Sequence, residues 1–144
     1  MVISKVIPTD LISLIALECE LFKSDCISKR QFLYHIKKNP LFVAKINNNM
    51  AGYILYFERK KTIRIYSLAV GLSYQGQGIA KTLIKNLLET TTKDISLEVN
   101  VANAGAIALY SKFGFSTIKT IEDYYEDGSS SFKMLLKRRP KLSL

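Results

Sequence analysis

A glycine-bearing segment between an apolar run and a helical pattern constrains this chain most. Residues 70–81 read Val-Gly-Leu-Ser-Tyr-Gln-Gly-Gln-Gly-Ile-Ala-Lys. The apolar run before this segment predicts a strand, and the pattern from Ile79 to Leu88 predicts a helix. Glycines at such a junction let backbone N–H groups approach a ligand closely, and the first N–H groups of a helix have no partner inside it. This geometry suits a phosphate or pyrophosphate. A plain strand–turn–helix connection with convenient glycines is the alternative interpretation.

Hydrophobic periodicity on both sides of this segment predicts further strands and helices. Strands are expected at 1–7, 41–46, 50–57, 62–70, 95–101, 115–121 and 130–136. Helices are expected at 10–22, 29–38, 79–88 and from Asn103 to near Lys112. The order β-α-α-β-β-β-α-β-α-β-β predicts a single mixed α/β domain over residues 1–144.

Residues of known capping type precede three of these helices. Thr9 precedes the first, Ser28 opens a capping box with Gln31 at the second, and Asn103 precedes the last. The first helix has an apolar side that we expect to be buried. Its members are Leu11, Ile12, Ile15, Leu17 and Cys19.

The composition favours a cytoplasmic protein without a structural metal. No apolar run reaches the roughly 18 residues of a membrane helix, and the N-terminus lacks the layout of a signal peptide. Cys19 and Cys26 form no Cys-x-x-Cys pair, and one histidine, His35, leaves no ligand set for zinc. We expect His35 to lie at a solvated surface, among the lysines and arginine of the second helix.

The formal net charge of +9 favours an anionic cofactor or a polyanionic partner. Coenzyme A fits this preference, as does RNA, although no RNA-binding motif is present. The basic tail 137–144 is expected to be a solvated end, with contact to ribosomal RNA as the alternative. A generally basic protein without a polyanionic partner explains the charge equally well.

Three segments together resemble the GNAT acetyltransferases. They are Gln75-x-x-Gly78-x-Ala80, the run 97–110 (Leu-Glu-Val-Asn-Val-Ala-Asn-Ala-Gly-Ala-Ile-Ala-Leu-Tyr) with Phe113-Gly114-Phe115, and Asp123-Tyr124-Tyr125. The last two are similar to the RimI-type branch, which acetylates the N-terminal alanine of a small-subunit ribosomal protein. The resemblance implies a mixed sheet of about seven strands flanked by about four helices. It also implies acetyl-CoA as co-substrate, and direct transfer to an amine in a ternary complex.

Glu98 is the candidate general base. In the strand 95–101, Ile95, Leu97, Val99 and Val101 share one face, and Ser96, Glu98 and Asn100 share the other. Amine acetylation requires a neutral amine, and a half-buried carboxylate can remove a proton directly or through water. An exposed glutamate, or one paired to a nearby lysine, is the competing interpretation. The resemblance implies the catalytic role.

Tyr110 is the candidate general acid. Its spacing from Ile107 also fits simple core packing. A phenol can donate a proton to the departing coenzyme A thiolate, and the resemblance implies this role. By the same resemblance Asn103, a probable helix cap on local grounds, also contacts acetyl-CoA.

The resemblance further assigns the cofactor-binding residues. Leu68, Ala69 and Val70 offer backbone groups to the pantetheine arm and the thioester carbonyl. The phosphate loop follows them in the chain. Its residues are Gln75, Gly76, Gln77, Gly78, Ile79, Ala80 and Lys81. We expect Tyr74, just before the loop, to pack rather than to contact the cofactor.

The acceptor stays open at this stage. The candidate substrate-binding residues are Asp123, Tyr124 and Tyr125. The acidic side chains in this segment could attract a cationic amine. The alternative is that Asp127-Gly128 is only a hairpin turn with solvated neighbours. The chain departs from the branch at three places on this side. This chain has Asp123 where the branch has asparagine, and Asn100 where the branch commonly has arginine. Residues 24–28 stand where the branch usually has Pro-Trp-Ser. A protein N-terminus leads, with a polyamine, an aminoglycoside-like amine or an aminoacyl-tRNA as alternatives. A non-catalytic coenzyme A-binding module is the alternative of a different class.

Overall fold

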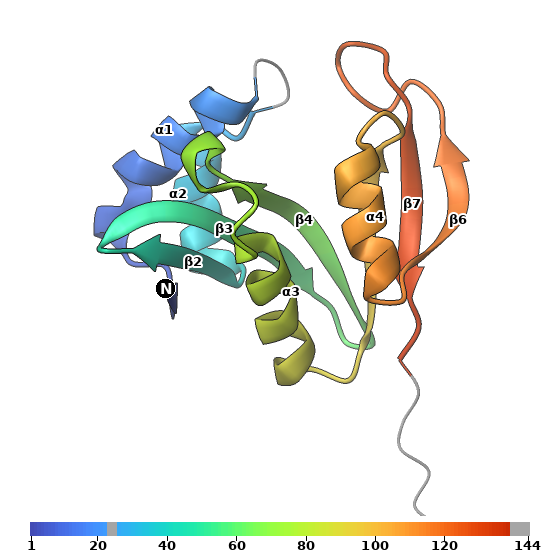
Figure 1. Cartoon of the computed structure of the whole chain (residues 1–144), viewed down its shortest axis with the longest axis horizontal. Coiled ribbons are helices and arrows are strands. Elements are labelled where there is room, and N and C mark those ends of the chain that lie inside the picture. The colour runs from blue at the N-terminus through green and yellow to red at the C-terminus, as the bar shows by residue number, and fades with distance from the viewer. Residues whose placement is uncertain (23–25, 139–144) are drawn as a thin grey trace, which may run out of the picture.

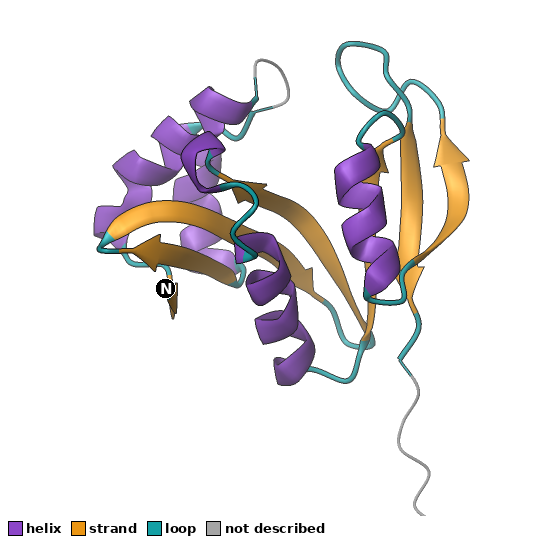
Figure 2. Cartoon of the chain, in the orientation of Figure 1, coloured by secondary structure: helices purple, strands orange, loops and turns teal. Residues whose placement is uncertain are grey.

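The computed structural model describes residues 1–22 and 26–138, and its strands form one seven-stranded sheet (Figures 1 and 2). The strand order is β1-β2-β3-β4-β5-β7-β6. The strands are β1 (Val2–Lys5), β2 (Leu41–Ile46), β3 (Asn49–Glu58), β4 (Thr62–Val70), β5 (Asp94–Asn100), β6 (Ser116–Ile121) and β7 (Ser131–Leu136). The helices within the described residues are α1 (Leu11–Leu21), α2 (Lys29–Lys38), α3 (Ile79–Thr90) and α4 (Ala104–Lys112), with 3-10 turns η1 (Pro8–Asp10) and η2 (Leu72–Tyr74). The predicted element order is confirmed.

Strands β4 and β5 pair in parallel, and they are hydrogen-bonded to each other only near the start of each strand. Their pairing runs from Thr62 opposite Asp94 to Ile65 opposite Leu97. Beyond these pairs β4 continues to Val70 and β5 to Asn100, and the two halves of the sheet splay apart in Figure 1. The facing backbone edges of the two strands are therefore left without strand partners in this stretch.

Each face of the sheet carries its own apolar core. On one face α3 packs against β2, β3 and β4, and the apolar core there, which includes Leu83 and Leu87, continues to Leu97 of β5 and Tyr110 of α4. On the other face α1 and α2 pack against β2 and β3, through residues such as Leu14 and Phe32. Figure 1 shows these two helix pairs on opposite sides of the sheet. The gap between the ends of β4 and β5 therefore lies between these two cores.

A β-bulge in β4 changes which way the following side chains point. Leu55 of β3 lies opposite Ser67, while the next residue, Tyr56, lies opposite Ile65, so Tyr66 is the extra residue. Bulges are common beside active sites, where they re-aim side chains. Here Tyr66 contacts the rings of His35 and Phe57, and Ser67 also points to the α1 and α2 face, where it meets Tyr53.

The start of the first helix differs from the prediction. Pro8 opens the 3-10 turn η1, and the carboxylate of Asp10, instead of Thr9, accepts a hydrogen bond from the backbone of Ile7 at 3.0 Å. Asp10 is 5% exposed and pairs with Lys45 of β2 at 2.7 Å. Thr9 lies inside the turn η1, and Asp10 takes the N-cap position of α1 without a side-chain cap hydrogen bond, so the expected cap at Thr9 is wrong.

The buried side of α1 also differs from the prediction. Leu14, Leu17 and Glu18 are its buried residues, while Ile12 is 80% exposed and Cys19 is exposed. The helix is apolar on several sides, so its sequence pattern does not define which side faces the sheet. The expectation that Ile12 and Cys19 pack in the core is wrong, and a glutamate lies there instead.

Other local expectations had mixed outcomes. Ser28 and Gln31 form the predicted capping box, and Asn103 caps α4. His35 is half-buried against Phe57 and Tyr66 instead of solvated, and burial lowers its pKa. Val101 lies in a turn after β5 and is 38% exposed, so it does not share the buried face. Of the basic tail 137–144, residues 139–144 lie outside the described part of the chain.

None of the helices described in the structure combines the length and the apolar character needed to cross a bilayer.

Candidate active site

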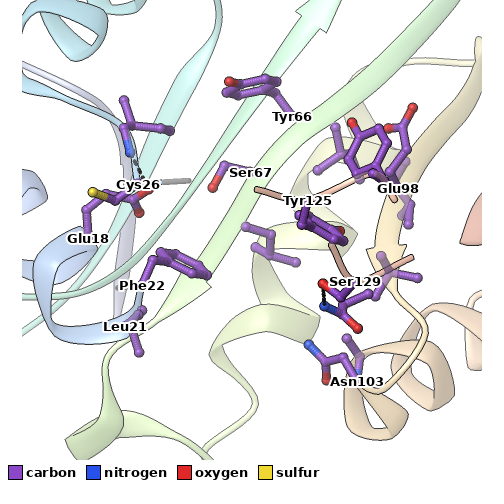
Figure 3. A pocket seen from close by; sticks show the side chains of 18 of the residues that line it. Glu18, Leu21, Phe22, Cys26, Tyr66, Ser67, Glu98, Asn103, Tyr125 and Ser129 are labelled. Carbon is purple, nitrogen blue, oxygen red and sulfur yellow. Dashed lines mark hydrogen bonds between the residues drawn. The ribbon is translucent and has the colours of Figure 1, made fainter. Parts of the chain in front are cut away.

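A cavity of about 760 Å³ lies where β4 and β5 part (Figure 3). Its walls come from α1, the segment before α2, β4, β5, α4 and the loop between β6 and β7. Its lining includes Glu18, Ile27, Tyr66, Ser67, Leu68, Leu97, Glu98, Asn100, Asn103, Tyr110, Tyr124, Tyr125, Asp127 and Ser129. Leu97 and Tyr110 belong to the core under α3 and α4, whereas Ile27 belongs to the core under α1 and α2. The cavity therefore opens toward both faces of the sheet.

Glu98 lies on the polar face of β5, as the strand pattern predicts. Its side chain is 12% exposed, and Oε2 accepts a hydrogen bond from Nε of Arg64 on β4 at 3.1 Å. Arg64 also donates from Nη2 to the hydroxyl of Tyr124 at 3.0 Å. The competing interpretation named a lysine as the ionic partner of Glu98, and in the structure the partner is Arg64. A carboxylate offers about four lone-pair sites, so one contact to Arg64 leaves acceptor capacity for a substrate.

Tyr110 on α4 lines the same cavity as this carboxylate. It is 8% exposed, lines the cavity and packs against Phe115 with 5.7 Å between the ring centroids. Burial, reinforced by the neighbouring Tyr125, raises the pKa of Tyr110 to about 12. Its phenol is therefore protonated at neutral pH and is able to donate a proton into the cavity. Core packing and proton donation are compatible for this residue.

Two asparagines, Asn100 and Asn103, line the cavity, and Asn103 is labelled in Figure 3. Asn103 accepts a hydrogen bond from the backbone of Ala106 at 3.1 Å, which caps α4. Asn100 donates to Ser129 at 2.9 Å and accepts from the backbone of Ala102 at 3.0 Å. Asn100 thus ties the end of β5 to the loop between β6 and β7. This contact was not foreseen, because it depends on the pairing of β5 with β7.

The loop before α3 has the local geometry predicted for an anion site. Gly76 and Gly78 have φ angles of +81° and +77°, a left-handed conformation that L side chains rarely adopt. A Cβ atom at either position would meet nothing within 4 Å, so open space lies in front of the loop. Gly78 is the N-cap of α3 and supplies no side-chain cap, in contrast to Ser28 at α2 and Asn103 at α4. The first N–H groups of α3 are therefore available to a ligand.

The structure brings some of the predicted site residues together and leaves others apart. Glu98, Tyr110, Asn103, Leu68, Tyr124 and Tyr125 all line the cavity. The loop 75–81 lies outside it, as does Val70, whose carbonyl accepts a hydrogen bond from Gln75 at 3.2 Å. Ala69 is buried toward α1.

Asp123 does not line the cavity. It is exposed in the turn after β6 and has a φ angle of +52°. Asparagine and aspartate are the non-glycine residues that best tolerate this conformation. Asp127 does line the cavity; its carboxylate accepts from both the backbone and the hydroxyl of Ser129, and the hydrogen bonds lower its pKa. Gly128 has a φ angle of +85°, as the turn interpretation of Asp127-Gly128 expects.

One set of polar cavity residues was not predicted. Glu18 of α1 is 2% exposed, accepts at Oε2 from the hydroxyl of Tyr53 at 2.6 Å, and lines the cavity. The same Tyr53 hydroxyl lies 2.7 Å from Oγ of Ser67, another lining residue. Burial raises the pKa of Glu18, and burial beside that carboxylate raises the pKa of Tyr53 well above its ordinary value. The available signal was a glutamate four residues after Leu14 and next to Leu17, on the side of α1 that faces the sheet.

Within residues 1–22 and 26–138, no group of three or more histidine, cysteine, aspartate or glutamate side chains is placed to hold a metal ion.

Comparison with known proteins supports the interpretation of this cavity. Residues 10–115 match the Acetyltransferase (GNAT) family. The chain belongs to this family. It is 34% identical, over 122 residues, to an N-alpha-acetyltransferase of Saccharolobus solfataricus, covering 72% of this chain and 73% of that protein. The family resemblance inferred from the three sequence segments is therefore confirmed.

Two solved structures extend the likeness. The ribosomal-protein-S18-alanine N-acetyltransferase from Escherichia coli superposes with a TM-score of 0.87 at 26% identity, covering 99% of this chain and 96% of that chain. Arabidopsis thaliana Naa50, in complex with the bisubstrate analogue CoA-Ac-MVNAL, gives a TM-score of 0.83 at 25% identity, covering 94% and 97%. The predicted fold and the assignment as an N-acetyltransferase are confirmed. The relatives include more than one kind of N-terminal acetyltransferase, so the RimI-type branch stays a prediction.

Proposed function

We propose that this acetyltransferase transfers the acetyl group of acetyl-CoA to the α-amine of a protein N-terminus, by direct transfer in a ternary complex. The cavity that opens to both faces of the sheet carries this proposal. A cofactor bound beside α3 and α4 can reach this cavity from one face of the sheet. An acceptor amine can enter it from the other face, beside α1. A ribosomal-protein N-terminus is the leading acceptor, in line with the protein to which the chain is similar in fold.

The chain's own groups fit coenzyme A. The uncapped start of α3 and the open space before Gly76 and Gly78 suit the pyrophosphate. We assign the loop Gln75 to Lys81 to this contact. Leu68 to Val70 lie on the stretch of β4 that has no β5 partner, so their backbone groups are offered to the pantetheine arm. Asn103, beside the cavity, completes the set.

The proposed chemistry uses the two walls of the cavity. Acetyl-CoA supplies an activated acetyl group as a thioester. Glu98 removes a proton from the acceptor amine, directly or through water, and Arg64 holds its carboxylate toward the opening. Tyr110, another lining residue, donates its phenolic proton to the departing coenzyme A sulfur, because a neutral thiol is a better leaving group than a thiolate. Tyr124 and Tyr125 line the entrance from the β6–β7 loop, where we place the acceptor, and Asp123 shapes the turn that presents them.

An acceptor panel tests the proposal. The purified chain is incubated with acetyl-CoA and peptides with free or formylated α-amines, with spermidine, with an aminoglycoside and with aminoacyl-tRNA, while thiol release and product mass are recorded. Acetylation confined to peptides with a free α-amine is the expected result. Modification of a polyamine, an aminoglycoside or charged tRNA in its place contradicts the proposed acceptor. Binding of acetyl-CoA without turnover on any amine points to a non-catalytic module.

Glu98→Gln tests the base. The variant keeps the shape and the contact to Arg64 but cannot take a proton. We expect turnover to fall about 100-fold near neutral pH, with acetyl-CoA affinity unchanged, because general base catalysis typically contributes about 10²–10⁴-fold. The loss is expected to shrink at alkaline pH, where more of the amine is already neutral. An unchanged rate and pH–rate profile would assign the proton transfer to another group.

A further inference from the structure

The buried contacts among Glu18, Tyr53 and Ser67 form a chain of hydrogen bonds with a fixed direction. Both Glu18 oxygens are acceptors: Oε1 takes the backbone N–H of Ile27 at 3.0 Å, and Oε2 takes the Tyr53 hydroxyl proton at 2.6 Å. A tyrosine hydroxyl has one proton. Since Tyr53 gives that proton to Glu18, its oxygen accepts in the contact to Ser67, 2.7 Å away. Ser67 must therefore be the donor in that contact.

This direction determines what Ser67 offers to the cavity. A serine hydroxyl has one donor proton and two acceptor lone pairs. The proton is directed at Tyr53, so only acceptor capacity remains on the cavity side, where Ser67 is a lining residue. A partner of Ser67 in the cavity must be a hydrogen-bond donor, and an amine or ammonium N–H is such a donor.

The position of Ser67 fits a role at the acceptor amine. It follows the bulge at Tyr66, which turns its side chain to the face covered by α1 and α2, and it precedes Leu68 on the unpaired stretch of β4. Figure 3 shows Ser67 and Glu18 on the side of the cavity across from Glu98. An amine placed between these walls meets an acceptor on each.

We propose that Ser67 binds the N–H of the acceptor amine, and that Tyr53 and Glu18 are positioning residues that keep the Ser67 hydroxyl turned away from it as an acceptor. This rests on the proposed function, because it names a binding contact for the amine of that reaction. It gives the buried glutamate of α1 a role distinct from that of Glu98. Glu98 takes the proton, and Ser67 fixes the orientation of the nitrogen.

The test compares hydroxyl deletions by acceptor kinetics and by calorimetry of an N-terminal peptide titrated into the chain saturated with coenzyme A. Ser67→Ala is expected to weaken peptide binding and raise the acceptor KM about tenfold, with the acetyl-CoA KM unchanged. Ser67→Thr, which keeps the hydroxyl, is expected to restore most of the binding. Tyr53→Phe keeps the ring against Phe32 (5.8 Å between centroids) but frees the Ser67 proton, and a loss of about threefold is expected.

The double variant and a matched control separate this role from a structural one. Ser67→Ala with Tyr53→Phe is expected to bind the peptide no more weakly than Ser67→Ala alone, since Tyr53 acts through Ser67. Tyr56→Phe removes a hydroxyl from a tyrosine that is 6% exposed on the same strand and outside the cavity, so the acceptor KM is expected to stay unchanged. Melting temperatures of all variants confirm that they are folded.

Each contrary result has a defined meaning. Peptide binding that survives Ser67→Ala, or losses that simply add in the double variant, overturn the inference while the acetyltransferase activity stands. A parent chain that binds formylated and free peptides equally also overturns it, because no amine contact then exists. A parent that binds free α-amines selectively without turnover leaves the inference standing and refutes the proposed function instead.

Discussion

The cofactor loop and the acceptor wall of this enzyme are specified in different ways. The loop Gln75 to Lys81 is contiguous, and its two left-handed glycines and its uncapped helix start are properties of neighbouring residues. The wall formed by Glu18, Tyr53 and Ser67 is collected from α1, β3 and β4, with contacts that span 35 and 14 positions. The geometry of the loop follows from local backbone conformation, whereas the wall depends on the whole N-terminal half packing correctly. This difference predicts that loop and wall variants fail on different substrates.

Tyr110→Phe should have the largest effect, since Tyr110 is the proposed general acid and belongs to neither the loop nor the wall. The variant keeps the ring packed against Phe115 and removes only the hydroxyl. Turnover is expected to fall about 10²–10⁴-fold, the usual contribution of general acid catalysis, while affinities for acetyl-CoA and peptide stay within about twofold. Steady-state kinetics and calorimetry check this. Wild-type turnover at wild-type stability would leave Tyr110 with a packing role alone.

Gly78→Glu should affect the loop and leave the wall unchanged. A carboxylate at the N-cap of α3 would oppose a bound phosphate, and affinity for acetyl-CoA is expected to fall about tenfold or more, with peptide affinity unchanged. Gly78→Ala is the matched control, because it carries the same strain at a φ of +77° without the charge. Calorimetry of acetyl-CoA binding that gives equal values for the parent, the alanine and the glutamate variants would remove the loop from the cofactor site.

Glu18→Gln should give the smallest effect, a change in how the stability of the fold depends on pH. Burial raises the pKa of Glu18 above its ordinary 4.5, against the opposing hydrogen bonds from Tyr53 and Ile27. The folded chain thus binds this proton more tightly than the unfolded chain, and ionisation of Glu18 lowers the free energy of unfolding as pH rises from 4.5 upward. The glutamine variant lacks this dependence. The melting temperature of the parent minus that of the variant should therefore decrease with pH.

Thermal melts of the two proteins across this pH range provide the measurement. Glu20→Gln, at an exposed position of the same helix, is the control for a change of surface charge. A difference that is constant with pH, or that grows as pH rises, would contradict the raised pKa of Glu18.

The same contrast explains what the sequence predicted. The strand pattern of β5 placed Glu98 on the polar face, and the cap at Asn103 and the capping box at Ser28 were visible in neighbouring residues. These features depend on short-range periodicity and local hydrogen bonds. The element order and the three family segments together carried the fold, because each of them is read within one continuous stretch.

The misses share a long-range cause. Asp10, and not Thr9, is the N-cap residue of α1, and its carboxylate pairs with Lys45 of the distant strand β2. Glu18 was buried because Tyr53 of β3 and the backbone of Ile27 satisfy its carboxylate, and no periodicity announces a buried charge. Arg64 became the partner of Glu98 through the parallel pairing of β4 with β5. Each of these partners is brought close by tertiary structure and lies far from Asp10, Glu18 or Glu98 in the sequence.

The parting of β4 and β5 also has a consequence for self-association. Unpaired strand edges normally act as templates that recruit strands from other chains and promote aggregation. In this fold the edges beyond Ile65 and Leu97 face each other across an internal cavity instead of lying at the rim of the sheet. They therefore lie away from the rim of the sheet, where a strand of another chain would pair. This stretch of β4 and β5 therefore lacks strand partners without adding an exposed edge to the sheet, which removes one route to self-association.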